Sequence, residues 1–386
     1  MISGFVLPDF GAVTETLRKT IHKKKGGGGG GAVAVYHRGE LVADAWAGAR
    51  DSAGAPWDRD TVAMSFSTTK GVVATTVHRL RDQGLVDYDE PVATYWPEFK
   101  ANGKERITVR HLLSHSAGLH HLRGVIDNAH EMLDWEHITA RLAAAEPRWE
   151  PGVHHGYHGI TYGFLVGEVI RRVTGLSVHD AVQREIVEPL GLDGMFIGTP
   201  PDHRHRVADL IMGFGGGPAR IEGLMARAER IEKLRPTIEA FMVEEFDRLL
   251  LSDAVHDAEL PALNGCFTAR SLARMYAALA NGGVLDGKRF LSEETLREAT
   301  TVQTRSRDVV VGVRMQWRLG YHMAGTTRGF LPHGFGHFGY GGSGAWADPD
   351  TDLAVAMVCN RVAGTPFADA RFMRVGGAAL RCAKTR

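Results

Sequence analysis

Cysteine is scarce in this chain, and its scarcity excludes several ways of stabilising or equipping a protein. The 386 residues include only Cys266, Cys359 and Cys382, and no CxxC pair occurs. An odd number of widely spaced cysteines predicts neither a disulfide framework nor a cysteine zinc site. The pattern favours a reduced, cytoplasmic setting.

Long apolar runs and an excess of one charge are also missing. No stretch of 18 or more apolar residues occurs, so we expect no transmembrane helix. The N-terminus lacks a basic region followed by a long apolar stretch and is not typical of a signal peptide. The 45 Lys and Arg residues balance 45 Asp and Glu residues, which gives no overall electrostatic reason to bind nucleic acid.

Strand-like patterns lie at the two ends of the chain, with helical patterns between them. Apolar runs within residues 32–48 and within residues 343–360 each flank a short polar turn, which is typical of a β-hairpin. Helical spacing dominates residues 67–300, and further helices are expected at residues 13–25 and 368–382. This order predicts one sheet built from both chain ends, with a helical domain inserted.

The same order predicts the domain boundaries. We expect residues 1–63 and 305–386 to form the sheet domain, and residues 64–304 to form an inserted all-helical domain. Within it, residues 219–253 are amphipathic and are divided or kinked by Pro236. This stretch is interpreted either as ordinary packing or as part of a cap, at about residues 201–255, that lines an apolar substrate pocket.

An unbroken run of six glycines, residues 26–31, follows the first predicted helix. The run satisfies the GxGxxG pattern trivially, but it follows a helix rather than a strand and is not closed by a GK[ST] sequence. We interpret it as a flexible connector or a tight backbone approach rather than as a phosphate-binding loop.

A serine and a lysine stand three residues apart in Ser67-Thr68-Thr69-Lys70, between a strand-like and a helix-like stretch. Residues at i and i+3 share one side of a helix, so the Lys70 ammonium can lie beside the Ser67 hydroxyl. A serine needs an adjacent base to become a nucleophile, and a lysine serves when burial lowers its pKa. Alone, this spacing is also compatible with a helix-capping serine and a solvated lysine.

Two further segments add candidates for chemistry. Tyr157 lies in a loop rich in Pro, Gly and His, just before a helix predicted at residues 161–174, where its hydroxyl can face a cleft. Residues 333–344 contain six glycines before the C-terminal hairpin, and such backbone can approach another group closely. Backbone N–H groups at this strand edge can form half of an oxyanion hole.

Two other patterns are interpreted as structural. Ser343 lies in a G-x-S-x-A sequence rather than G-x-S-x-G, and strands rather than a strand-turn-helix surround it. Nineteen histidines include dense groups near residues 120, 155 and 204, but no HExxH motif occurs. We expect no metal site, with some histidines at the mouth of a catalytic cleft and others in solvent.

Together, the three segments resemble the serine β-lactamase and penicillin-binding-protein superfamily, in particular its class C-like branch of family VIII carboxylesterases and related hydrolases. Ser67 to Lys70 match the S-x-x-K motif, Tyr157 matches the tyrosine of Y-x-N, and His337-Phe338-Gly339 stands where the family has K-T-G. The similarity spans roughly residues 32–194 and 260–361 and leaves residues 201–255 uncovered.

The resemblance implies an α+β fold with a central antiparallel sheet flanked by helices. It implies that Ser67 is acylated, while Lys70 and Tyr157 share the proton transfers in an order that stays open. The backbone N–H groups of Ser67 and Tyr340 would hold the oxyanion.

The resemblance also implies a substrate site at His337, Gly339, Gly159 and His158, where His337 orients the substrate or polarises Tyr157. Two of these positions depart from the family pattern. Gly159 stands in place of the asparagine that grips a β-lactam amide. His337 replaces a lysine, and a histidine is only partly charged at neutral pH. Both departures argue against efficient antibiotic hydrolysis.

The implied activity is that of a serine carboxylesterase acting on small to medium acyl esters, with lipid or steroid catabolism as an associated setting and no cofactor or metal. An acyltransferase, a weak β-lactamase or D-amino-acid peptidase, and an inactive scaffold or sensor stay open as alternatives. The expected partner is a small-molecule ester, and the sequence leaves open whether the chain is a monomer or a homodimer.

Overall fold

The computed structural model describes residues 2–21, 29–212, 231–362 and 369–386. Residues 26–28 of the glycine run and residues 219–230 of the amphipathic stretch lie outside the described residues.

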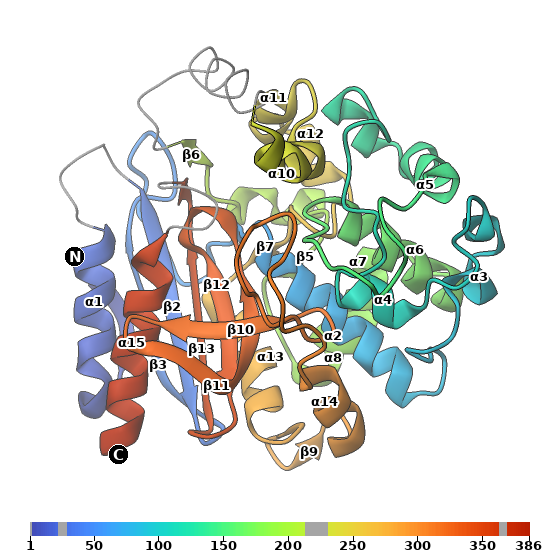
Figure 1. Cartoon of the computed structure of the whole chain (residues 1–386). Coiled ribbons are helices and arrows are strands. Elements are labelled where there is room, and N and C mark those ends of the chain that lie inside the picture. Colours follow the sequence, from blue (N-terminus) through green and yellow to red (C-terminus); the bar gives the residue numbers. More distant parts are fainter. Residues whose placement is uncertain (1, 22–28, 213–230, 363–368) are drawn as a thin grey trace.

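The two ends of the chain build one seven-stranded antiparallel sheet (Figure 1). In spatial order the strands are β1 (Ile2–Val6), β3 (Glu40–Gly48), β2 (Gly30–His37), β13 (Leu353–Cys359), β12 (Gly344–Asp348), β11 (Gly329–Phe338) and β10 (His322–Thr326). β2 and β13 pair along their whole length, from Leu353 opposite His37 to Cys359 opposite Gly31. The prediction of one antiparallel sheet from both chain ends is therefore confirmed.

The hairpin turns follow from their residues. Arg38 and Gly39 join β2 to β3 with φ angles of 53° and 80°, the pair of positive values that a two-residue type I′ turn requires. The polar sequence 349–352 forms a longer, four-residue connection between β12 and β13, in which only Asp352 has a positive φ, of 47°. No strand was expected at β1, because this short, glycine-interrupted stretch has little alternation of polar and apolar residues. Only its pairing with β3 defines it.

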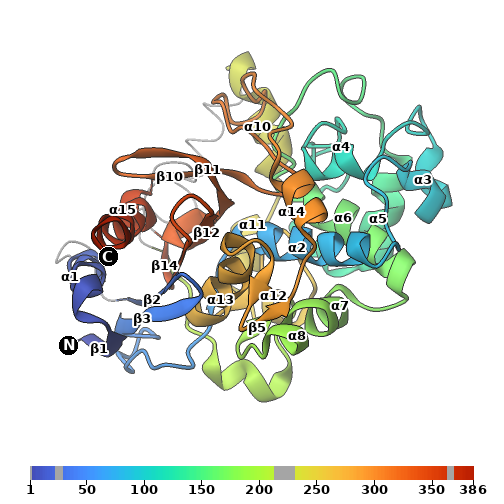
Figure 2. The ribbon, with the colours of Figure 1, turned by 90° about the horizontal axis from the view of Figure 1, so that it is seen from below.

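Helices cover both faces of the sheet (Figure 2). α1 (Gly11–Ile21) and α15 (Ala370–Thr385) contact each other and one face, which buries Val33 and Val35 of β2. α13 (Ala269–Ala280) lies on the other face, where it contacts β2, β12 and β13. Since both faces are covered, β2 and β13 are buried along their lengths, as their nearly continuous apolar sequences require.

The segment between the two halves of the sheet is mainly helical. Its other α-helices are α2 (Thr68–Asp82), α3 (Val92–Tyr95), α4 (Val109–Leu113), α5 (Trp135–Ala144), α6 (Thr161–Thr174), α7 (Val178–Val182), α8 (Glu188–Leu190), α10 (Arg235–Phe241), α11 (Phe246–Leu250), α12 (Ala254–Asp257) and α14 (Glu293–Thr300). Pro236 stands in the first turn of α10, where its missing N–H costs nothing. Whether it divides the amphipathic stretch stays a prediction, because residues 219–230 lie outside the described residues.

The prediction of an all-helical insertion is wrong in detail, because short strands also form there. They are β4 (Ala63–Met64), β5 (Met195–Phe196), β6 (Ile211–Met212), β7 (Cys266–Phe267), β8 (Val284–Leu285) and β9 (Lys288–Arg289), and β6 pairs with β14 (Arg361–Val362). Strands of two residues carry no periodicity, so only pairing defines them. The domain boundaries after residues 63 and 304 stay a prediction.

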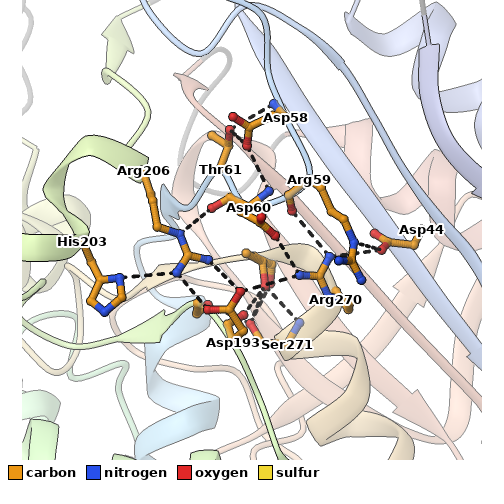
Figure 3. A network of polar contacts seen from close by, with 12 residues as sticks. Asp44, Asp58, Arg59, Asp60, Thr61, Asp193, His203, Arg206, Arg270 and Ser271 are labelled. Carbon is orange, nitrogen blue, oxygen red and sulfur yellow. Dashed lines mark hydrogen bonds and ion pairs between the residues drawn. The ribbon is translucent and has the colours of Figure 1, made fainter.

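A network of charged side chains joins the sheet to the helical segment (Figure 3). Arg270, in the first turn of α13, lies 3.1 Å from Asp44 of β3 and 3.2 Å from Asp60. Arg206 binds Asp193 at 2.8 Å and donates to the Asp60 carbonyl at 2.9 Å. The network fixes residues 58–61, just before β4, against both parts of the fold.

The described part of the chain bears on three expectations, which concern membrane-spanning helices, metal sites and disulfides. No helix there is long and apolar enough to cross a membrane. No group of three or more His, Cys, Asp or Glu side chains in those residues is placed to hold a metal ion. Cys266, Cys359 and Cys382 are buried and unpaired.

Candidate active site

Ser67 stands at the start of α2, directly after β4 and a strained turn. Phe66 adopts a left-handed φ of 47°, which non-glycine residues seldom adopt. Its ring is buried and meets Tyr340 edge-on at 5.4 Å between centroids. The turn leaves Ser67 partly exposed at the N-terminus of a 15-residue helix, where the helix dipole favours negative charge.

Lys70 lies one helical turn further and is completely buried. Its Nζ donates to the Ser67 Oγ at 3.0 Å and to the Ala262 carbonyl at 3.0 Å. Both acceptors are uncharged. Burial therefore lowers the pKa of Lys70 well below its ordinary value and favours the neutral amine. The structure thus brings Ser67 and Lys70 together as the S-x-x-K spacing predicts.

The loop that supplies the Ala262 carbonyl is fixed from several sides. The Asn264 side chain donates to the Val255 and Ala258 carbonyls at 2.7 and 2.6 Å and accepts from the Leu260 N–H at 3.0 Å. The role of this loop is not predictable from the sequence, because a backbone carbonyl can belong to any residue type. The Ala262 carbonyl of this loop holds the Lys70 side chain next to Ser67.

Tyr157 comes to the same point from the loop before α6. Its side chain is 5% exposed, its hydroxyl lies near enough to Ser67 for that residue to influence its pKa, and the Lys70 Nζ lies 4.9 Å from its ring centroid. Burial raises the pKa of the phenol, although Ser67 opposes that shift. Tyr157, distant in the sequence, thus joins Lys70 beside the Ser67 hydroxyl.

The position of Tyr157 depends on Asp308, a residue that the sequence analysis missed. The Asp308 carboxylate is 1% exposed and accepts from the Tyr157 backbone N–H at 3.1 Å. It also accepts from the N–H groups of Val310 and Val311, each at 2.9 Å, and from the Trp317 indole at 2.8 Å. The Trp317 ring stacks on Tyr157 at 5.2 Å with 10° between planes. Asp308 therefore positions both the backbone and the ring of Tyr157.

We predict that Asp308→Asn slows the reaction through Tyr157. An amide nitrogen cannot accept the N–H groups that the carboxylate satisfies, so we expect a loss of about 1–3 kcal/mol of unfolding free energy and a lower kcat. The Asp308 charge also raises the pKa of Tyr157, so its removal should move any alkaline limb of the pH–rate profile to lower pH. Denaturant unfolding and a pH–rate profile test this, and an unchanged kcat in the folded variant would exclude the role.

His337 reaches the site from β11. It is 2% exposed, and its Nδ1 lies 2.9 Å from the Phe338 carbonyl, while its Nε2 is buried without a hydrogen-bond partner within the described part of the chain. Burial, the nearby His322 and Lys70 lower the pKa of His337 well below its ordinary value. The expectation of a partly charged histidine is therefore wrong, since a buried imidazole next to other basic groups stays neutral.

The backbone after His337 lies against the serine turn. A Cβ on Gly339 would lie 2.1 Å from the Ser65 carbonyl oxygen, so only glycine permits this approach. Next to it, Tyr340 begins a short turn. Among the hydrogen bonds of the described residues, none has the N–H of Ser67 or of Tyr340 as donor. This is compatible with an oxyanion hole at these two N–H groups, which stays a prediction.

His158 does not match its predicted role, whereas the role predicted for Gly159 stays open. The His158 side chain is completely buried, its Nε2 accepts from the Leu119 N–H at 2.9 Å, and its Nδ1 lies 2.7 Å from the Gly156 carbonyl. With both nitrogens engaged in the loop, the side chain is not available to a substrate, which corrects the expected substrate contact. Gly159 lies against the Phe241 ring of α10.

The dense groups of histidine are buried only in part, since His154 and His205 are exposed, as was expected for some of them. His115, His120, His121 and His155 are at most 5% exposed, and burial lowers their pKa values. His115 contacts the Tyr157 ring at 5.1 Å and accepts from the His158 N–H. These four histidines pack as buried neutral rings, and which histidines line the mouth of the cleft stays a prediction.

Comparisons with known proteins extend over nearly the whole chain. The model of a family described as Beta-lactamase matches residues 15–380. "Esterase/beta-lactamase LipL" of Mycobacterium tuberculosis is 43% identical over 347 residues, which cover 86% of this chain and 77% of that protein.

Two solved structures are similar over 99% of this chain and 100% of their own. One is a family VIII carboxylesterase, with a TM-score of 0.87 and 34% identity. The other is a penicillin-binding-protein homologue from Caulobacter crescentus, with a TM-score of 0.84 and 35% identity.

Proposed function

The chain belongs to the beta-lactamase family of serine hydrolases, and on that premise we propose that it hydrolyses small to medium acyl esters through an acyl-enzyme on Ser67. The observation that carries the proposal is the 3.0 Å contact between the Ser67 Oγ and the Nζ of a completely buried Lys70. A serine with an uncharged amine at this distance has the base that it needs to attack a carbonyl.

The two candidate bases differ in their pKa shifts. Burial lowers the pKa of Lys70 and raises that of Tyr157. The neutral amine is therefore the easier group to obtain near neutral pH, and Lys70 takes the Ser67 proton as the Oγ–carbonyl bond forms. The Tyr157 hydroxyl gives its proton to the leaving alkoxide and takes one from the Lys70 ammonium, which returns both groups to their neutral forms. Water then attacks the acyl-enzyme with the same proton transfers, which releases the carboxylic acid and restores Ser67.

The remaining candidate residues stabilise the tetrahedral intermediate and orient the substrate. The N–H groups of Ser67 and Tyr340 bind the oxyanion of the tetrahedral intermediate. In the neutral His337 ring, Nδ1–H donates to the Phe338 carbonyl, so Nε2, which has no partner among the described residues, can only accept. It orients a hydroxyl group, that of Tyr157 or of the alcohol part of the substrate, and does not attract a carboxylate. Esters from lipid or steroid breakdown have this chemistry, and we propose them as the natural class.

A panel of p-nitrophenyl esters with acyl chains from short to long tests the proposal, with nitrocefin and a D-alanyl dipeptide in parallel. We expect turnover of the short and medium esters and little cleavage of nitrocefin or the dipeptide, because His337 is uncharged and Gly159 has no side-chain amide. Faster turnover of nitrocefin than of every ester would contradict the proposal. Ester cleavage that yields a new ester when alcohol is added would favour acyl transfer.

A further inference from the structure

Gly159 is a glycine for reasons of space and not of backbone conformation. Its φ lies outside the left-handed region, so other residues can adopt this backbone. However, a Cβ at this position would lie 2.2 Å from the Phe241 Cε1 and 2.6 Å from its Cζ. The aromatic ring fills the volume that the side chain of any larger residue would enter.

Phe241 is held in that volume by α10, of which it is the last residue. The N–H groups of Leu122 and Arg123 donate to the Glu239 carbonyl at 2.7 and 3.0 Å, and the Thr237 hydroxyl donates to the Val310 carbonyl. Neighbouring Ala240 is completely buried. The ring is therefore placed by a docked helix and is not a loosely held surface group.

The surroundings of the ring are apolar and adjoin the candidate catalytic groups. Phe241 lies 5.9 Å from Tyr157 between ring centroids. A separate apolar cluster gathers here, comprising Tyr157, Ala240, Val310 and Trp317, with Phe241, Val311 and Met315 packed against it. A phenyl ring offers no hydrogen bond, so a polar group brought against this wall loses its water without compensation.

We propose that Phe241, with Gly159 opposite, selects substrates by their acyl part: it favours esters whose acyl chain is apolar throughout and rejects acyl groups that carry an amide beside the reacting carbonyl. This inference rests on the proposed function and names its substrate class. Discrimination by one hydrophobic contact is about 10- to 200-fold.

Two p-nitrophenyl esters of the same shape test the inference. The 4-methylpentanoate has an apolar branched chain, and the N-acetylglycinate has an amide at the same position of the acyl chain. We expect the wild type to favour the 4-methylpentanoate, and Phe241→Ala to reduce the ratio of the two kcat/KM values by about 10-fold. The double variant G159N/F241A, which places an amide in the emptied volume, should lower the ratio further. Phe241→Leu should keep it.

The controls separate this inference from the proposed function. Phe330→Ala removes a phenylalanine that is 67% exposed on β11, and it should leave the ratio unchanged. Gly159→Asn alone should lower the melting temperature, and Phe241→Ala should relieve that loss, which needs no turnover to measure. A ratio that stays constant across F241A and G159N/F241A overturns the inference while ester turnover stands. If no variant or wild type cleaves either ester, the proposed function itself fails.

Discussion

Ser67→Ala is expected to abolish ester turnover while leaving the protein folded. Loss of the nucleophile in serine hydrolases costs about 10⁴-fold or more in kcat, and what is left comes from binding and the oxyanion hole. The fold should tolerate the change, because Ser67 is partly exposed and its side chain does not cap α2. Turnover of p-nitrophenyl butyrate, beside a thermal melt, measures both effects.

Ser343→Ala is the matched control for that experiment. Ser343 lies in the glycine-rich segment before β12, and its Oγ accepts from the Cys359 N–H at 3.1 Å, which ties the strand ends together. We expect this variant to retain turnover and to react with a fluorophosphonate as the wild type does. Retained activity in Ser67→Ala, or lost labelling in Ser343→Ala, would move the nucleophile away from Ser67.

The relation between Ser67 and Lys70 is predictable from sequence because helical periodicity converts a spacing of three into a side-chain contact. The sheet is predictable for a similar reason, since the apolar runs around residues 38 and 350 have the length of strands and are separated by turn residues. In both cases the information is local, and a short stretch of sequence contains all of it.

Asp308, Trp317 and Phe241 could not be found in this way. Asp308 and Trp317 lie in a loop without periodicity, and an aspartate in a loop is ordinarily solvated. Asp308 is buried and positions Tyr157 only because the Tyr157 N–H and the Trp317 indole pack against it and donate hydrogen bonds to its carboxylate. Phe241 lies 82 positions after Gly159 in the numbering. Such contacts depend on how distant segments pack, and no local pattern records them.

Lys70→Met should cost about 10²- to 10⁴-fold in kcat/KM, the usual scale for a general base. Methionine keeps much of the length and apolar volume of the lysine but cannot take the Ser67 proton. In the wild type, kcat/KM should rise with pH through the pKa of Lys70, which burial has moved well below 10.5. The methionine variant should lose that limb of the pH–rate profile.

Tyr157→Phe is the informative comparison. It removes a hydroxyl but keeps the ring that packs on Trp317 and Phe241. We expect it to be slow as well, but to keep the rising limb, because Lys70 is still present. A limb that disappears in Tyr157→Phe and persists in Lys70→Met would exchange the roles of the two residues.

Lys70→Met also has an effect on stability that needs no substrate. The pKa of Lys70 is lower in the folded chain than in the unfolded one. Between those two pKa values the unfolded state binds the extra proton, so this group makes the unfolding free energy rise with pH. Methionine does not titrate, so the variant lacks this dependence. The unfolding free energy of the variant minus that of the wild type should therefore be greatest at acidic pH and decrease as the pH approaches 10.5. Urea unfolding at a series of pH values measures the difference. A difference independent of pH would mean that Lys70 is charged in the folded protein, and a charged lysine cannot be the base.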